Sequence, residues 1–243
     1  MGSYNSYSPQ NKFKIKISKT VRIIIIFFLA YQFLSVFVIS SFIIKTSAME
    51  PGLPKDQRIL SAPIVSGARL DLFKIKIPGF KEPERGDIVL VRPGNSDKLA
   101  WYILIFDPLV RFFTFQKKSL DPNISKNWNN QLSVKRIIGV PGDTVQMKDY
   151  KFLIKGKEGT EYFSEENIII NKYNILIPSN ISGIDPLSPF SGNMKEIKLS
   201  ENQYFIANDN RRVSYDSRLY GPISRNEILG PVFLSYYPGF SFK

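Results

Sequence analysis

The hydrophobic pattern divides the chain into two parts. Residues 23–44 contain no charged residue, whereas the chain after residue 50 alternates short apolar runs with polar, turn-forming residues. As a helix, residues 23–44 would be about 33 Å long at ~1.5 Å per residue, enough to cross a hydrocarbon core of ~30 Å. The pattern therefore predicts one N-terminal transmembrane helix at residues 23–44, followed by an exterior domain.

A cleaved secretory signal is the alternative for this segment. Thr46, Ser47 and Ala48 offer small residues at the spacing of a cleavage site. The apolar run is, however, longer than the ~7–15 residues of a signal h-region. We therefore expect an uncleaved anchor.

The exterior pattern is typical of β structure, because Gly, Pro, Asn and Asp separate the short apolar runs. A hairpin tip is expected at Lys155-Gly156. The predicted strands are residues 58–62, 87–91, 133–140, 144–147, 152–154, 168–170, 203–207 and 228–236. The sequence thus predicts a mostly β exterior without a long amphipathic helix.

Residues 99–115 depart from this pattern, since they are aromatic and aliphatic apart from a few polar positions. Asp107-Pro108 interrupts the run, so a second transmembrane helix is not expected. Two interpretations stay open for the segment. It forms core strands with a buried turn, or it is a hydrophobic surface at the bilayer interface.

Composition restricts the possible chemistry. The 243 residues are enough for one sizeable core or two small ones, and they include no cysteine and no histidine. Disulfides, thiol nucleophiles, Ser-His-Asp triads and His-based zinc sites are therefore excluded. A general base must be Lys, Asp, Glu or Tyr.

The net charge of +12 is concentrated in part at the N-terminus, where residues 1–22 carry five basic residues and no acid. This flank predicts a cytoplasmic N-terminus, a single membrane pass at 23–44 and an exterior domain at 45–243. The remaining basic residues are mixed with acids, and no nucleic-acid module is recognisable. Nucleic-acid binding is therefore not expected.

Four motifs follow the apolar run in order, and together they resemble type I signal peptidases, the membrane-bound Ser/Lys endopeptidases. They are TSAMEPGL at 46–53, RGDIV at 85–89, KRIIGVPGDTV at 135–145 and NDNRRVSYDSR at 208–218. The resemblance covers roughly residues 20–236, apart from an expansion at about 92–132. It implies a signal-peptidase-type antiparallel β domain behind one transmembrane helix.

The resemblance also implies roles for individual residues. Lys135 would be the general base, and Ser214 would orient its amine. A lysine is a base only when neutral, and burial can lower its pKa from ~10.4 by up to ~3–5 units. Val134, Ile137 and Ile138 are apolar neighbours that suit such a pocket.

Further motif residues would support this pair. Ion pairs are expected between Asp216 and Arg218 and between Asp209 and Arg136, although surface salt bridges are the plain alternative. Thr46 would supply an oxyanion-hole hydroxyl beside the backbone N–H of residue 48.

Alignment on Met49 and Pro51 puts the family's nucleophilic serine at Ala48. A methyl group cannot attack a carbonyl. Ser47 is one residue out of register and is expected to point away from Lys135, which makes it a poor surrogate. Ala48 is either a deliberate Ser-to-Ala substitution or the mark of a natural paralogue that has lost catalysis.

The motifs depart from the family pattern at three other places. Gly52 replaces the usual Thr, Asn208 replaces Gly, and Arg212-Val213 replaces Asp-Asn. The last change puts a cation near the site loop.

The implied reaction is hydrolysis of preproteins after small residues at the last and third-last positions of the signal peptide. The implied partners are signal peptides and the bacterial-type cytoplasmic membrane, with no metal or organic cofactor and a monomeric state. Two alternatives remain. The chain is a silent member that binds signal peptides without cleavage, or an unrelated membrane-tethered β assembly domain.

Overall fold

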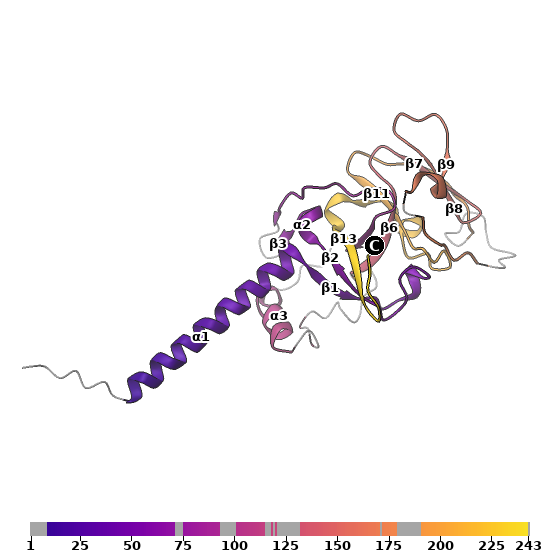
Figure 1. Ribbon diagram of the computed structural model, residues 1–243. Coiled ribbons are helices and arrows are strands. Elements are labelled where there is room, and N and C mark those ends of the chain that lie inside the picture. The colour runs from indigo at the N-terminus through magenta and orange to yellow at the C-terminus, as the bar shows by residue number, and fades with distance from the viewer. Residues whose placement is uncertain are drawn as a thin grey trace, which may run out of the picture.

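The computed structural model describes residues 9–70, 75–92, 101–114, 118, 120, 132–170, 172–178 and 191–242. Every pair of named strands is antiparallel. The helix α1 projects from one end of this β structure (Figure 1). The mostly β domain that the sequence predicts is confirmed.

The helical elements include two long helices and several single turns. They are α1 (Pro9–Phe33), η1 (Leu34–Val38, a π-helix), η2 (Ser47–Met49), α2 (Pro63–Ser66), α3 (Trp101–Phe113), α5 (Glu165–Ile168), α6 (Ser217–Tyr220) and η4 (Arg225–Glu227).

In the described part of the chain, the strands form three sheets. They are β1 (Ser40–Ile43), β2 (Arg58–Ser61), β3 (Arg69–Leu70), β4 (Ile75–Lys76), β5 (Ile88–Val91), β6 (Ser133–Gly139), β7 (Thr144–Lys148), β8 (Lys151–Lys155), β9 (Phe163–Ser164), β10 (Met194–Lys198), β11 (Gln203–Ala207), β12 (Ile223–Ser224), β13 (Ile228–Tyr237) and β14 (Ser241–Phe242).

The largest sheet has the order β1-β2-β13-β5-β6-β11-β12, with β14 paired to β13. β13 connects the two halves of this sheet because it pairs with both β2 and β5. Register shifts between Ile228 and Gly230 and between Val232 and Leu234 let the strand bend from one neighbour to the other. Next to it, β5 aligns Val89 with Lys135 of β6.

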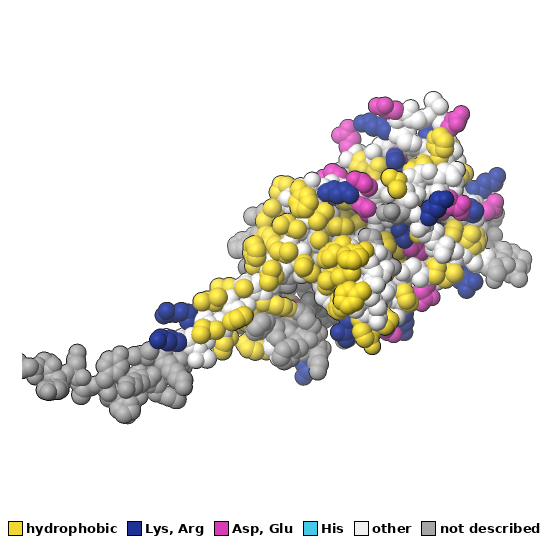
Figure 2. Space-filling view, viewed as in Figure 1, with side chains coloured by type: hydrophobic (Ala, Val, Ile, Leu, Met, Phe, Trp, Pro, Cys, Tyr) yellow, Lys and Arg dark blue, Asp and Glu magenta, His cyan; other side chains and the backbone are white. Residues whose placement is uncertain are grey.

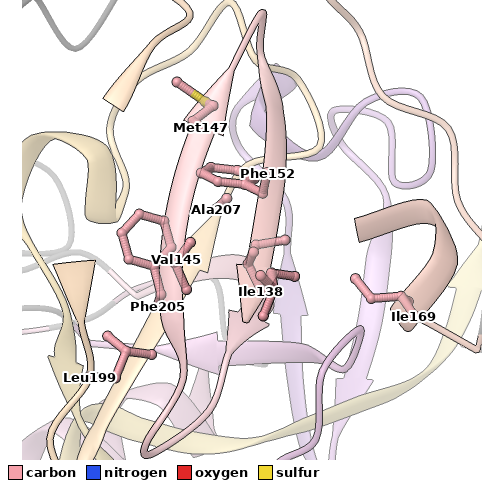
Figure 3. Packing of buried hydrophobic residues seen from close by; sticks show 9 residues of the cluster. Ile138, Val145, Met147, Phe152, Ile169, Leu199, Phe205 and Ala207 are labelled. Atoms are coloured by element: carbon pink, nitrogen blue, oxygen red, sulfur yellow. The ribbon is translucent and has the colours of Figure 1, made fainter. Parts of the chain in front are cut away.

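The second sheet has the order β10-β7-β8-β9. β7 and β8 form a hairpin whose turn residues Asp149 and Tyr150 both have positive φ, as two-residue turns of this kind require. One buried cluster joins this sheet to the first (Figure 3). Its members are Ile138, Val145, Met147, Phe152, Ile154, Ile169, Leu199, Phe205 and Ala207.

The expected transmembrane helix over residues 23–44 is wrong as a continuous element. α1 ends at Phe33, η1 follows, and β1 pairs with β2 through the register Ser40↔Ser61 to Ile43↔Arg58. Backbone hydrogen bonds to a neighbouring strand compete with the helix here, and the uncharged pattern alone carries no sign of that partner. In the described part of the chain, no helix is both long and apolar enough to cross a membrane.

Residues 99–115 also differ from the expected core strands, because Trp101–Phe113 forms α3. Short apolar runs do not distinguish buried strands from helices, and Pro108 does not interrupt this one. α3 contacts α1 near the C-terminal end of α1 (Figure 1). Much of the predicted expansion at 92–132 lies outside the described residues, including 93–100 and 121–131.

Most predicted strands are present within one or two residues of their expected limits. The exception is the strand at 168–170, because Glu165–Ile168 forms α5 instead. Ser164 caps this turn by accepting a hydrogen bond from the Glu166 amide. A serine at this position signals a helix start, but the apolar residues that follow favoured the prediction of a strand. Near the expected hairpin tip at Lys155-Gly156, β8 does end, and it pairs with β9 after a longer connection.

Candidate active site

The segment that carries Ala48 is held in place by apolar side chains on both sides of it. Thr46 is extended and exposed, and Ser47–Met49 form the short helical turn η2. Met49 and Leu53 are fully buried in a cluster with residues of β2, β5, β6 and β13. The Leu53 amide also donates to the Met49 carbonyl over 2.8 Å. The turn is therefore a fixed part of the core.

A loop after β11 binds this turn through its backbone. The Asn210 amide donates to the Ala48 carbonyl over 3.0 Å, and Asn210 Nδ2 donates to the Ser47 carbonyl over 3.1 Å. Both bonds use main-chain groups of the turn, so they do not depend on the side chain at position 48.

The same loop binds Lys135. This side chain extends from β6, is 2% exposed, and donates from Nζ to Asn208 Oδ1 over 2.5 Å and to the Tyr215 carbonyl over 2.7 Å. Burial lowers the pKa of Lys135 to about 8, with Asp216 opposing the shift and Arg218 adding to it. Residues 208–215 thus contact both the Ala48 turn and the buried amine.

Two hydrogen-bond partners of Lys135, the Asn208 side chain and the Tyr215 carbonyl, were not implied by the resemblance. Ser214 is buried beside Tyr215, and its role in orienting the amine stays a prediction. Sequence reasoning missed Asn208 and the Tyr215 carbonyl as partners of the amine. The departure from glycine at position 208 was the available signal, but only the fold shows which way that amide points.

The two expected ion pairs are present, and both are buried rather than on the surface. Arg136 donates to Asp209 over 2.8 and 2.7 Å, and Arg218 donates to Asp216 over 2.9 and 2.8 Å. Burial alone would raise the pKa of Asp216, but Arg218, Lys135 and the Asn208 amide outweigh it, and the pKa is lowered. Asp216 is therefore an anion in the folded protein.

A third buried pair connects the site loop to the second sheet. Arg211 is fully buried and donates to Glu165 of α5 and to the Asn208 carbonyl, both over 2.5 Å. The Tyr173 hydroxyl also donates to Glu165, and the Arg211 guanidinium lies 4.6 Å from the centre of the Phe152 ring. Sequence reasoning missed Glu165 and Tyr173, because neither lies in a motif. The cation noted at Arg212 is exposed.

The site contains a buried amine with a lowered pKa, which is a property that a general base requires. No group of three His, Cys, Asp or Glu residues among the described residues could hold a metal ion. A mostly β domain thus holds one buried lysine and one short turn through a common loop, and the turn carries Ala48.

Comparison with known proteins names the family. The family profile described as "Signal peptidase, peptidase S26" matches residues 17–237, and the chain belongs to this family. The alternative of an unrelated assembly domain is therefore wrong.

Relatives agree with this assignment. Signal peptidase I V of Bacillus subtilis (strain 168) is 30% identical over 51% of this chain and 71% of its own length. The probable signal peptidase I-2 of Synechocystis sp. (strain PCC 6803) is 25% identical over 95% of this chain and 77% of its own. Signal peptidase IB of Staphylococcus aureus (strain COL) is 24% identical over 85% and 82%.

Proposed function

We propose that this chain binds the signal peptides of exported preproteins at a type I signal peptidase site, with the scissile carbonyl placed between residue 48 and Lys135. The observation that carries the proposal is the buried lysine with a lowered pKa, held by the loop that also binds the Ala48 turn. The family assignment supports the substrate class. An extended peptide would add its backbone beside the strands that flank the site.

The chemistry of such a site is a Ser/Lys hydrolysis. A neutral Lys135 takes the proton from a serine hydroxyl at position 48, and the serine oxygen attacks the substrate carbonyl. The Thr46 hydroxyl and the residue 48 amide would stabilise the oxyanion. Ala48 has no hydroxyl, so the chain binds substrate without cutting it. The expected weakness of Ser47 as a surrogate assumed an extended strand, whereas Ser47–Met49 form a helical turn, so the alternation of side chains along a strand does not decide where its hydroxyl points.

The membrane is the proposed location, with the N-terminus in the cytoplasm, the catalytic domain outside and the protein acting as a monomer. Support comes from the distribution of side chains on the face shown in Figure 2. Hydrophobic side chains cover much of the part of α1 next to the domain and the adjoining part of the domain, while many charged ones lie at the far end, near the second sheet. Ile23 to Phe27 of α1 are all exposed apolar residues.

The test restores the missing hydroxyl with Ala48→Ser and measures cleavage of a preprotein with small residues at the last and third-last signal-peptide positions. We expect cleavage at that bond, and we expect its loss in Ala48→Ser/Lys135→Met, which keeps the volume of the lysine stem but has no amine. Both variants must unfold cooperatively like the starting protein. Cleavage that is independent of Lys135 would reject the mechanism.

A non-catalytic role is the second candidate, because Asn208 as well as Ala48 departs from the family pattern at the reacting groups. It predicts that a folded Ala48→Ser variant binds a fluorescent signal peptide yet cleaves nothing. Failure of the chain to bind signal peptides would contradict both candidates.

A further inference from the structure

Asn208 is locked in place by four hydrogen bonds. Its backbone amide donates to Asp216 over 2.9 Å, and its carbonyl accepts from Arg211 over 2.5 Å. Its side-chain Nδ2 donates to the Val213 carbonyl over 2.7 Å. Because a carbonyl only accepts, this last bond fixes which end of the amide is nitrogen, and Oδ1 is left facing the Lys135 amine.

The charges around the site show why this single amide matters. Arg136, Arg211 and Arg218 each have a carboxylate partner of their own. Lys135 instead donates to two neutral oxygens, those of the Asn208 side chain and the Tyr215 backbone. The attraction of Asp216 raises the pKa of the amine, and the repulsion of Arg218 lowers it.

Two neutral acceptors therefore offset part of the cost of burying the ammonium ion, although burial still lowers the pKa of the amine. Hydrogen bonds that a group makes in its charged form favour that form. The Tyr215 contribution comes from the backbone and would be made by any residue. The Asn208 contribution depends on the side chain, and the family pattern has glycine, which carries no acceptor, at this position.

We propose that Asn208 is a positioning residue that holds the Lys135 amine in its protonated form, and that it is a second obstacle to hydrolysis besides Ala48. A protonated amine has no lone pair with which to take a proton from a hydroxyl group. The inference rests on the proposed function for the role of Lys135 as a base. The state of the amine itself can be measured independently of that role.

The direct test uses the full chain with Ala48 unchanged. The amine of Lys135 is titrated by NMR with labelled lysine, and Lys135→Met identifies its signal. Asn208→Leu, which keeps the side-chain volume but has no acceptor, should lower the midpoint by about one unit or more, because hydrogen bonds to charged groups are worth about that much. Asn208→Asp should raise it.

Opposite shifts in the two variants cannot come from a general loosening of the fold, so they separate positioning from a structural role. Asn208→Gly is the second acceptor-free variant and should lower the midpoint as well. Unchanged midpoints in folded Asn208→Leu and Asn208→Gly proteins would overturn the proposal.

A kinetic test separates this inference from the proposed function. In the Ala48→Ser background, adding Asn208→Gly should move the acid limb of the kcat/KM profile down by about one pH unit. Because the pKa of Lys135 starts at about 8, this shift should raise cleavage at pH 7 about fivefold. If Ala48→Ser cleaves and Asn208→Gly leaves its pH profile unchanged, the inference fails. If neither variant cleaves although the NMR midpoints shift, the positioning of the amine by Asn208 holds, whereas the peptidase mechanism fails together with the role of Asn208 as an obstacle to it.

Discussion

Lys135 is a buried amine whose charge the fold tolerates at a cost. Its pKa of about 8 is set first by burial, which disfavours the ammonium ion. In the unfolded chain the amine would titrate at about 10.4. The unfolded state therefore binds more protons than the folded state between these two values, and folding becomes more favourable as pH rises through this window.

The first prediction concerns this window. Relative to Lys135→Met, the starting protein should gain about 3 kcal/mol of unfolding free energy between pH 7.5 and pH 10.5. The measurement is urea unfolding at a series of pH values. Tyrosines with raised pKa values, such as Tyr204, occur in both proteins, so their effect cancels in the difference. Parallel pH curves for the two proteins would show that Lys135 keeps its ordinary pKa.

Several residue-level features were predictable because they lie in motifs. Lys135 and the pairs of Arg136 with Asp209 and of Asp216 with Arg218 come from sequence blocks of fixed spacing. The Asn208 amide was not predictable as a partner of the amine. The orientation of this amide depends on its hydrogen bond to the Val213 carbonyl. The directions of backbone carbonyls in a loop cannot be predicted from the types of its residues.

At the scale of elements, apolar patterning found strands better than it found helix ends. β2, β5, β6 and β11 have punctuation by turn residues on both sides, and the prediction located them within about one or two residues. The end of α1 and the start of β1 fall inside one uncharged run. Nothing local marks that boundary, because β1 is fixed by pairing with β2.

The second prediction tests the close packing of β13. A Cβ atom on Gly230 would lie 2.8 Å from the Ala62 carbonyl oxygen and 3.0 Å from Pro63 Cα, and backbone atoms cannot move aside cheaply. Gly230→Ala should therefore lower the unfolding free energy by about 1–3 kcal/mol. Gly239→Ala is the matched control, since a Cβ there meets nothing within 4 Å and should change stability by less than about 0.5 kcal/mol. Equal stabilities for the two variants would refute the packing argument.

At the scale of the whole molecule, the site loop connects the two sheets. Arg211 belongs to the loop that binds Lys135 and Ala48, and its partner Glu165 belongs to α5 beside the second sheet. Both are buried away from solvent. Separating the sheets would leave an unpaired charge in the interior. The pair therefore couples the unfolding of one sheet to that of the other.

The third prediction is that either single change to this pair is costly. Glu165→Ala and Arg211→Met should each lose about 3–5 kcal/mol in urea unfolding, because each leaves a buried charge or donor without its partner. The double variant should lose clearly less than the sum of the two.

The neighbouring residue provides the control for this pair. Glu166 pairs with Lys151 over 3.0 Å, but both side chains are about half exposed. Glu166→Ala should cost less than about 1 kcal/mol. Additive losses at Glu165 and Arg211 would mean that the two sheets do not depend on their pairing.

The hydrogen bonds from Asn210 to the backbone of the Ala48 turn affect which mutations at position 48 the fold can accept during evolution. Since Asn210 binds only main-chain oxygens there, a serine codon, one base away from an alanine codon, would restore a hydroxyl without rebuilding the loop. A glycine codon at position 208 lies two bases from an asparagine codon, and the intermediate codons encode serine or aspartate. We therefore expect position 48 to change between alanine and serine more readily than position 208 changes between asparagine and glycine, so natural relatives should combine serine at 48 with asparagine at 208 more often than alanine at 48 with glycine at 208.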